Sequence, residues 1–529
     1  MASRETGHDS PIFLLFLIIT AIVCGALVMV VEVLGSRVIG PFFGVSLFVW
    51  TALITVTLVA LAVGYAAGGI LADRWGSPDG LYALILAAGV LVMLVPFLKA
   101  GVIRVCLPLG LRAGAMASAA MLFALPLVLL GCVSPYIVRI GAREMGTIGR
   151  TVGLFYAVST AGSFAGTVLT GFVLIAYLGV AQAFVFVGAV PVVLSAVYFL
   201  FYRRKRALAS AALLVPLFLF LLPAAYPRSK TLPDGTVVTT PLSRDGFYGN
   251  VTVVDMDYGH LRTRNMLIDG QNQGGIDLRN GMSLYGYSYL LGFLPYALNP
   301  GGRTCLVIGL GAGIIPLWYE ARGVRTDVID INPDVVEIAR EYFGFRVSGE
   351  VIIDDARYFL AGATKKYDYI VLDVFNGDTT PGHLLSVEAL RLVKERLSPG
   401  GIFAINLIGS LRPGAYMTAS IAKTLEQVFR TVDFYPVDTV ELDKGFGSIS
   451  VIAYEGPRVA IDLDRVRGFP LHPNADSLWK NFGKRIEFGA GTPAIVLTDD
   501  YNPMDFYDTW LKEEMRGYLV KYMDWDIFL

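Results

Sequence analysis

The chain has 529 residues, of which 55% are hydrophobic and 16% are charged, and its formal net charge is −1. A soluble domain carries about 25% charged residues, so this composition argues against an ordinary soluble enzyme. The small net charge and the lack of a long basic run exclude a nucleic-acid-binding chain. The four cysteines and four histidines have no spacing typical of a metal site, so we expect no metal.

Charge is distributed unevenly along the chain. Residues 1–225 hold 13 Lys and Arg but 6 Asp and Glu, a net charge of +7, whereas the remaining residues carry a net charge of −8. We therefore predict a transmembrane helical bundle at 1–225, followed by a water-soluble region long enough to bury a full core.

Charge-free stretches in the first region are long enough for seven membrane-spanning helices, since about 20 apolar residues cross the hydrocarbon core. The predicted spans are 12–34, 44–71, 80–98, 114–139, 151–176, 181–202 and 207–225. Small residues are frequent in them and allow close helix packing. Basic residues favour a cytoplasmic N-terminus, so seven spans place the soluble region outside the cytoplasm. A reversed bundle or one miscounted span would place it inside, so the side that it faces stays open. We expect an integral protein of the cell (inner) membrane, with the lipid bilayer as a partner.

Residues 226–300 have the pattern of a small β domain with a connecting helix. The β-branched runs 237–240 and 251–255 are bounded by Gly and Asp, and the run 266–270 ends at a turn. The aromatic-rich, amphipathic stretch 283–298 predicts a helix.

Strands and helices alternate in residues 301–529, which predicts a Rossmann-like, doubly wound α/β domain. The expected strands are 305–308, 326–329, 351–353, 369–372 and 402–407, and the expected helices include 333–342 and 386–397.

Glycine or aspartate follows each of the first four of these strands, at the sheet edge where doubly wound folds bind ligands. The residues are Gly309, Gly311 and Gly313 after the first strand, then Asp330, Asp355 and Asp373 after the next three. Glycines let the backbone approach a ligand, and an acid about 20 residues later commonly binds ribose hydroxyls. The pattern predicts a site for an adenosyl nucleoside, with Asp355 near the adenine and Asp373 near the reacting atom.

Residues 248–407 resemble the spermidine synthase (aminopropyltransferase) family. The resemblance rests on Ile268-Asp269-Gly270-Gln271-Asn272-Gln273, the glycine turn, Asp330-Ile331-Asn332, Asp355-Ala356, Asp373, Leu384–Leu390 and Pro399-Gly400-Gly401. Together with the helices, the chain is similar to proteins described as fused major-facilitator/spermidine synthase. The resemblance implies a multispan helical bundle, a small β domain and a Rossmann-like catalytic domain of the methyltransferase type.

The family transfers an aminopropyl group from decarboxylated S-adenosylmethionine to an amine such as putrescine. The resemblance therefore implies a membrane-anchored transferase that uses this co-substrate, or a related adenosyl nucleoside, and a polyamine acceptor. The residues implied to hold the nucleoside are Gln273, Gly309, Gly311, Gly313, Asp330, Asp355 and Ala356. Asp373 is implied to be the catalytic acid nearest the amine. Soluble relatives are commonly dimers, so a homodimer is one expected assembly.

The sequence departs from the family where the acceptor would bind. The family's Asp-Ser-Ser-Asp-Pro is replaced by Asp373-Val374-Phe375-Asn376-Gly377-Asp378, and its Tyr-His-Glu by Tyr285-Gly286-Tyr287. The residues assigned to the acceptor side are Tyr248, Tyr285, Asn376, Asp378, Asp499 and Asp500. The last two either supply missing amine ligands or form a turn that stabilises a loop.

Three functions stay open from the sequence. The first is an aminopropyltransferase, and the second is a polyamine- or nucleoside-binding transporter or sensor that has lost catalysis. The third is a methyltransferase on the same fold, against which the β domain and the Asp-Gly-x-x-Gln element argue.

Overall fold

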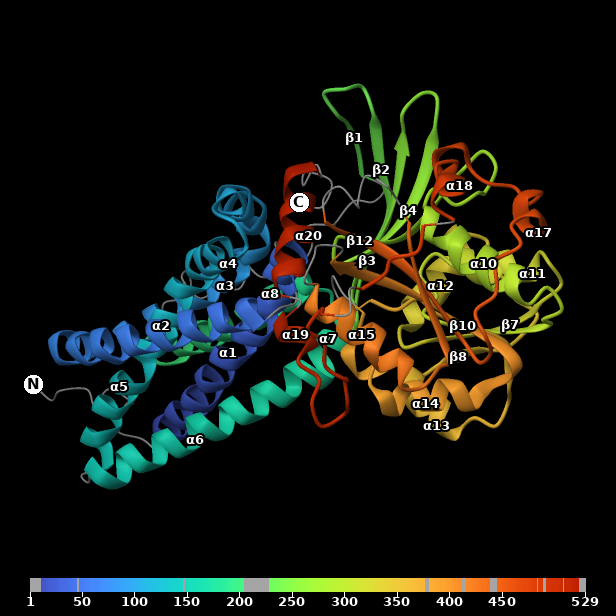
Figure 1. Cartoon of the computed structure of the whole chain (residues 1–529). Coiled ribbons are helices and arrows are strands. Elements are labelled where there is room, and N and C mark those ends of the chain that lie inside the picture. Colours follow the sequence, from blue (N-terminus) through green and yellow to red (C-terminus); the bar gives the residue numbers. More distant parts are fainter. Residues whose placement is uncertain are drawn as a thin grey trace, which may run out of the picture. The chain divides into compact units, whose positions relative to one another are not determined.

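The computed structural model describes residues 11–44, 47–145, 148–203, 228–375, 380–410, 415–437, 445–482, 484–488, 491–507 and 509–522. The chain divides into two compact units (Figure 1). One consists mainly of residues 1–225 and the other mainly of residues 226–523, with residues 244–249 grouped with the first. The finer three-domain division predicted from the sequence stays a proposal.

The first unit is helical. In the described part of the chain, six helices are long and apolar enough to cross a membrane, and they correspond to the first six predicted spans. Four of the six are α1 (Pro11–Phe43), α2 (Leu47–Trp75), α3 (Pro78–Cys106) and α8 (Val180–Phe201). The other two each consist of two labelled helices, α4 (Leu111–Ala119) with α5 (Leu125–Met145), and α6 (Ile148–Leu169) with α7 (Ile175–Tyr177). Short π-helical segments join α4 to α5 and α6 to α7. The seventh predicted span, 207–225, lies outside the described residues.

Glycines lie at the closest approaches between these helices. A Cβ atom on Gly162 of α6 would collide with the backbone of Ile22 in α1. A Cβ atom on Gly89 of α3 would lie 2.7 Å from the carbonyl oxygen of Gly188 in α8. Larger side chains at these positions would force the helices apart, so the small residues permit the tight bundle, as expected from the sequence.

The second unit begins with a five-stranded sheet in which the strands lie in sequence order. The strands are β1 (Arg228–Thr231), β2 (Val237–Gly246), β3 (Gly249–Asp257), β4 (Arg262–Ile268) and β5 (Gln271–Asp277). The helix α10 (Gly286–Leu298) follows, as predicted, and connects this sheet to the next one.

A seven-stranded sheet with the order β11-β12-β10-β9-β6-β7-β8 forms the rest of the unit. Its strands are β6 (Thr304–Ile308), β7 (Arg325–Asp330), β8 (Val351–Ile353), β9 (Tyr367–Leu372), β10 (Leu397–Ser410), β11 (Thr431–Pro436) and β12 (Phe446–Tyr454). The helices between and after them are α11 (Ile314–Glu320), α12 (Pro333–Tyr342), α13 (Ala356–Gly362), α14 (Val387–Arg396), α15 (Tyr416–Glu426), α17 (Asp464–Arg467), α18 (Leu478–Asn481), α19 (Met504–Tyr507) and α20 (Thr509–Tyr522).

The Rossmann-like architecture predicted for this region is confirmed, with one difference in strand direction. The five predicted strands pair in parallel, but β12 is inserted between β10 and β11 and runs antiparallel to both. The sequence analysis had not identified β11 or β12.

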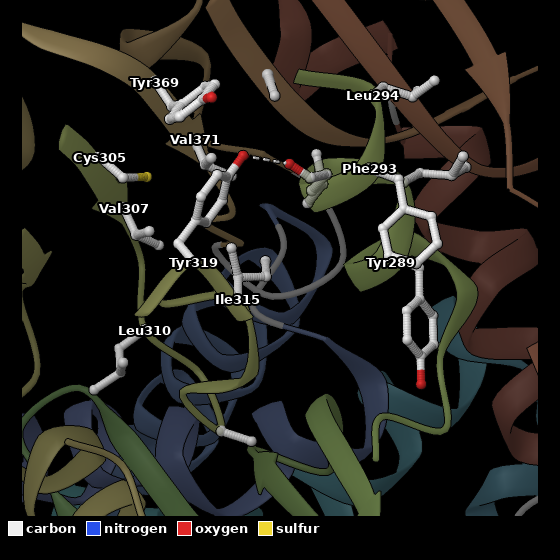
Figure 2. Packing of buried hydrophobic residues seen from close by; sticks show 14 of the residues in the cluster. Tyr289, Phe293, Leu294, Cys305, Val307, Leu310, Ile315, Tyr319, Tyr369 and Val371 are labelled. Carbon is white, nitrogen blue, oxygen red and sulfur yellow. Dashed lines mark hydrogen bonds between the residues drawn. The ribbon is translucent and has the colours of Figure 1, made fainter. Parts of the chain in front are cut away.

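Alternate residues of each central strand enter two separate cores, because successive side chains point to opposite faces of a sheet. One core contains Cys305 and Val307 with α10, α11 and α12, and the other contains Leu306 and Ile308 with α14 and α15. Figure 2 shows Cys305 and Val307 beside the buried ring of Tyr319. The Tyr319 hydroxyl donates to the carbonyl oxygen of Leu291 in α10 at 2.9 Å. Both faces of the sheet are therefore covered, which leaves the carboxyl ends of the strands as the edge for ligands.

Candidate functional site

The turn after β6 depends on glycine backbone conformations. Gly309, Gly311 and Gly313 have φ angles of 88°, 51° and 77°, a region that side-chain-bearing residues rarely adopt. A Cβ atom on Gly309 would collide with the carbonyl oxygen of Asp373, and one on Gly311 with that of Gln273. The turn is therefore packed between β5 and the end of β9, which brings together three regions that the sequence analysis assigned to one site.

Asp330 ends β7 and organises the same turn. Its Oδ2 accepts a hydrogen bond from the Leu310 N–H at 2.8 Å, and its Oδ1 accepts one from the Asn332 N–H at 2.8 Å. Burial raises the pKa of Asp330, and these two backbone hydrogen bonds oppose the rise. Each carboxylate oxygen has a further lone pair, so the group can still accept from a ligand hydroxyl.

Asp355 follows β8 and is the N-cap of α13. Its carboxylate accepts a hydrogen bond from the Tyr358 N–H at 2.9 Å. The other oxygen, Oδ2, lies 4.0 Å from Nε2 of His383. Ala356 is the first residue of α13 and packs against the core.

The late turn that contains Asp499 and Asp500 is held by Arg357 of α13. The Arg357 guanidinium donates to both oxygens of Asp499, one of these bonds being 2.8 Å long, and also to the carbonyl oxygen of His383 at 3.0 Å. The Arg357 hydrogen bond and charge lower the pKa of Asp499. Asp500 is exposed in the same turn. Asp499 thus already has a cationic partner, the Arg357 guanidinium. Binding of an amine by Asp499 and Asp500 stays a prediction.

Asp373 follows β9 and lies beside the glycine turn, because its N–H donates to the carbonyl oxygen of Ile308 at 2.8 Å. Its Oδ1 accepts a hydrogen bond from Nδ2 of Asn406 at 2.8 Å. Burial raises the pKa of Asp373 to about 6, and the Asn406 hydrogen bond acts in the opposite direction. A carboxyl group that ionises near neutral pH is suited to general base catalysis.

Two tyrosines at the start of α10 form an uncharged part of the site. The Tyr285 hydroxyl donates to Oδ1 of Asn265 at 2.7 Å and accepts a hydrogen bond from the Asn272 side chain. Burial raises the pKa of Tyr285 to about 12, and burial and the Asp373 charge raise the pKa of Tyr287. Both hydroxyl groups are therefore neutral at pH 7.

The remaining sequence-predicted residues, on the acceptor side, stay predictions. Tyr248 lies in the turn between β2 and β3 and is 39% exposed. Asn376 and Asp378 lie outside the described residues. Asn406 and Arg357 are not among the residues predicted from the sequence, although a polar residue inside the apolar run of β10 is a signal for Asn406.

Part of the second unit matches a known protein family. Residues 285–459 match the family described as the Spermine/spermidine synthase domain. The C-terminal half thus carries a spermine/spermidine synthase domain, and six long apolar helices precede it.

Similar proteins include enzymes of two types. Over 118 residues, the chain is 37% identical to a polyamine aminopropyltransferase of Vibrio vulnificus, an alignment that covers 20% of this chain and 38% of that protein. Over 135 residues, it is 36% identical to an N-terminal histidine N-methyltransferase of Emericella nidulans, which covers 25% of this chain and 24% of that protein. The chain therefore spans well under half the length of these relatives.

Among solved structures, the spermidine synthase of Thermotoga maritima matches with a TM-score of 0.33 and 17% sequence identity. The match covers 51% of this chain and 91% of that one. The strand order and helix layers described above are those of a Rossmann-like α/β domain.

Proposed function

We propose that the second unit is a transferase that moves an aminopropyl group from decarboxylated S-adenosylmethionine to an amine. The observation that carries this proposal is Asp373, a half-buried carboxyl group beside the glycine turn whose pKa is raised to about 6. The family match of residues 285–459 supports the same reaction class.

In this reaction the acceptor nitrogen attacks the carbon bonded to the donor's sulfonium. A C–N bond forms, the C–S bond breaks with its electron pair going to sulfur, and the amine loses a proton. Asp373 would hold the acceptor's ammonium group close to the donor and take up that proton. The residues proposed to hold the nucleoside are Gln273, Gly309, Gly311, Gly313, Asp330, Asp355 and Ala356.

The acceptor is proposed to be a polyamine such as putrescine. The uncharged Tyr285 hydroxyl keeps one lone pair that can accept a hydrogen bond from an amine, since its proton is donated to Asn265. The neutral Tyr287 hydroxyl likewise does not compete for the proton of the amine. Tyr248, Asn376, Asp378, Asp499 and Asp500 complete the proposed acceptor set.

The test is an incubation of the purified full chain in detergent with decarboxylated S-adenosylmethionine and a panel of amines, followed by mass spectrometry. We expect 5′-methylthioadenosine and an amine that has gained an aminopropyl group. Asp373→Asn is expected to lower the rate by at least about 100-fold. Asp476→Asn, a change of the same chemistry at an exposed position, is expected to leave the rate unchanged. Formation of no thioether with any amine would reject the proposal.

A second candidate is methyl transfer, which the 36% identity to the N-methyltransferase favours. It needs the same attack on a carbon next to a sulfonium, but with S-adenosylmethionine as donor. The mass added to the acceptor separates the two reactions. Stabilisation by either donor without any product would instead favour a binding protein that has lost catalysis.

We propose that the chain is an integral protein of the cell (inner) membrane with its second unit in the cytoplasm, where sulfonium donors are made. With a cytoplasmic N-terminus, this placement requires an even number of membrane crossings in the whole chain. Six apolar helices long enough to cross lie in the described part of the chain, and the predicted span 207–225 lies outside it. A fluorescent reporter fused after Leu529 is expected to fold in the cytoplasm, and a periplasmic phosphatase fused there is expected to be inactive. The reverse result would mean an odd number of crossings and would exclude a cytoplasmic donor.

A further inference from the structure

Polar side chains of β10 and β12 lie beside Asp373, which directly follows β9. β9 and β10 run in parallel, and their register, continued by one residue, makes Asp373 and Asn406 neighbours. On β12, Ser450 is directly opposite Asn406 and Ser448 lies two residues away. Because side chains alternate along a strand, Asn406, Ser448 and Ser450 lie on one face of the sheet.

Hydrogen bonds connect three of these side chains in one direction. The Ser448 hydroxyl donates to Oδ1 of Asn406 at 2.9 Å, and Nδ2 of Asn406 donates to Oδ1 of Asp373 at 2.8 Å. Asn406 is 3% exposed, so water does not substitute for these partners. A flipped amide would place its oxygen against the Asp373 carboxylate, so the ionised carboxylate selects the donor orientation, and the hydrogen bond from Ser448 to the amide oxygen holds the side chain in it.

We propose that Asn406, oriented by Ser448, is a positioning residue that holds Asp373 in place and stabilises its carboxylate form for the transfer reaction. This inference rests on the proposed function. An amide that donates to a carboxylate favours the charged form, whereas burial disfavours it. In the described part of the chain, the Asp373 charge acts on the hydroxyl of Tyr287 in α10, and the turn after β6 presents uncharged glycine backbone to Asp373.

The first test replaces the amide with an apolar group of the same branched shape, Asn406→Leu. Loss of a hydrogen bond to a charged group is expected to raise the pKa of Asp373 by about one unit. Since kcat/KM reports ionisations of the free enzyme, its acid limb near pH 6 is expected to move to about pH 7. The variant is expected to lose about tenfold in kcat/KM below that limb and to recover most of it about two pH units above.

Serine variants provide a second, milder test on β12. Ser448→Ala is expected to move the limb in the same direction by a smaller amount, because the freed amide is less well oriented. Ser450→Ala is the matched control on the same strand and face, because the Ser450 hydroxyl has no hydrogen-bond partner in the described part of the chain. It is expected to keep the wild-type profile.

A direct titration separates this inference from the proposed reaction. Infrared spectra of the full chain report carboxyl protonation without any substrate, and subtraction of the Asp373→Asn spectrum isolates the Asp373 band. If the wild type makes no product but the Asn406→Leu and Ser448→Ala midpoints rise, the proposed function fails and the positioning role stands. An unchanged midpoint in both variants, or an equal loss of activity at every pH, would overturn the positioning role.

Discussion

The substitution Asp373→Asn is expected to stabilise the second unit at neutral pH while it removes activity. In the folded protein the pKa of Asp373 is about 6, against an ordinary value of 3.8. The folded state therefore binds more protons than the unfolded state between these two pH values. Stability falls as the pH rises through this window and stays lower above it, because the fold must then hold an ionised, partly desolvated carboxylate.

The size of the effect follows from the pKa difference. About two pKa units at 1.36 kcal/mol each give a ceiling of roughly 3 kcal/mol. Partial exposure of Asp373 reduces this, so we expect about 2 kcal/mol at pH 8 and close to zero at pH 4. The asparagine keeps a carbonyl oxygen that accepts from Asn406, so the existing hydrogen bond is retained.

The assay is thermal unfolding of the full chain in detergent, followed by tryptophan fluorescence at several pH values between about 4 and 8. A gain of about 2 kcal/mol corresponds to a rise in Tm of roughly 4–8 °C at pH 8. The control is Asp499→Asn, where the folded pKa is lowered by Arg357. Asp499→Asn is expected to destabilise the fold, which is the opposite sign. The exposed ion pair contributes less than about 1 kcal/mol to the free energy of unfolding at neutral pH, and this contribution is lost as the pH falls below 4. A difference between Asp373→Asn and wild type that does not change with pH would refute the reasoning.

Two further predictions concern glycines, each with a matched control. Gly309→Ala is expected to lower the Tm of the second unit and to abolish donor binding in calorimetry, because its Cβ would collide with the Asp373 carbonyl oxygen. Gly323→Ala, at a φ of 72° with open space around the Cβ, is expected to cost only the backbone strain of about 1–2 kcal/mol and to retain binding. In the helical unit, Gly162→Val is expected to lower the Tm in detergent, whereas Gly153→Val on the same helix, with nothing near its Cβ, is expected to change it little.

Local patterns in the sequence were sufficient for the order of elements. The limits of β8 and α12 were predicted to the residue, because a short apolar run and a Pro-initiated amphipathic helix leave few alternatives. The first three long apolar helices extend past the ends of the predicted spans, as α3 does beyond Lys99 to Cys106. Charge-free length measures only the apolar stretch, and a helix continues into the interfacial region as long as its backbone hydrogen bonds are satisfied.

Contacts between residues far apart in the sequence could not be predicted from local patterns. Arg357 and Asp499 are separated by 142 positions, and only the fold reveals that a cation already neutralises the late acid. The antiparallel insertion of β12 was missed for a related reason. A strand covered on both faces has the same apolar pattern in either direction, so its composition does not determine its neighbours.

The four strand-end acids also differ in a way that residue type alone does not show. Asp330 has a backbone N–H on each oxygen, and Asp354 and Asp355 accept backbone N–H groups at the start of α13. Each of these acids shapes a turn or a helix start, so its presence at a strand end has a structural explanation besides ligand binding. Asp373 accepts instead from a side-chain amide that is itself held by a serine, in surroundings that raise its pKa to about 6. The chemistry proposed for the site therefore depends on the partners that the sheet brings to Asp373.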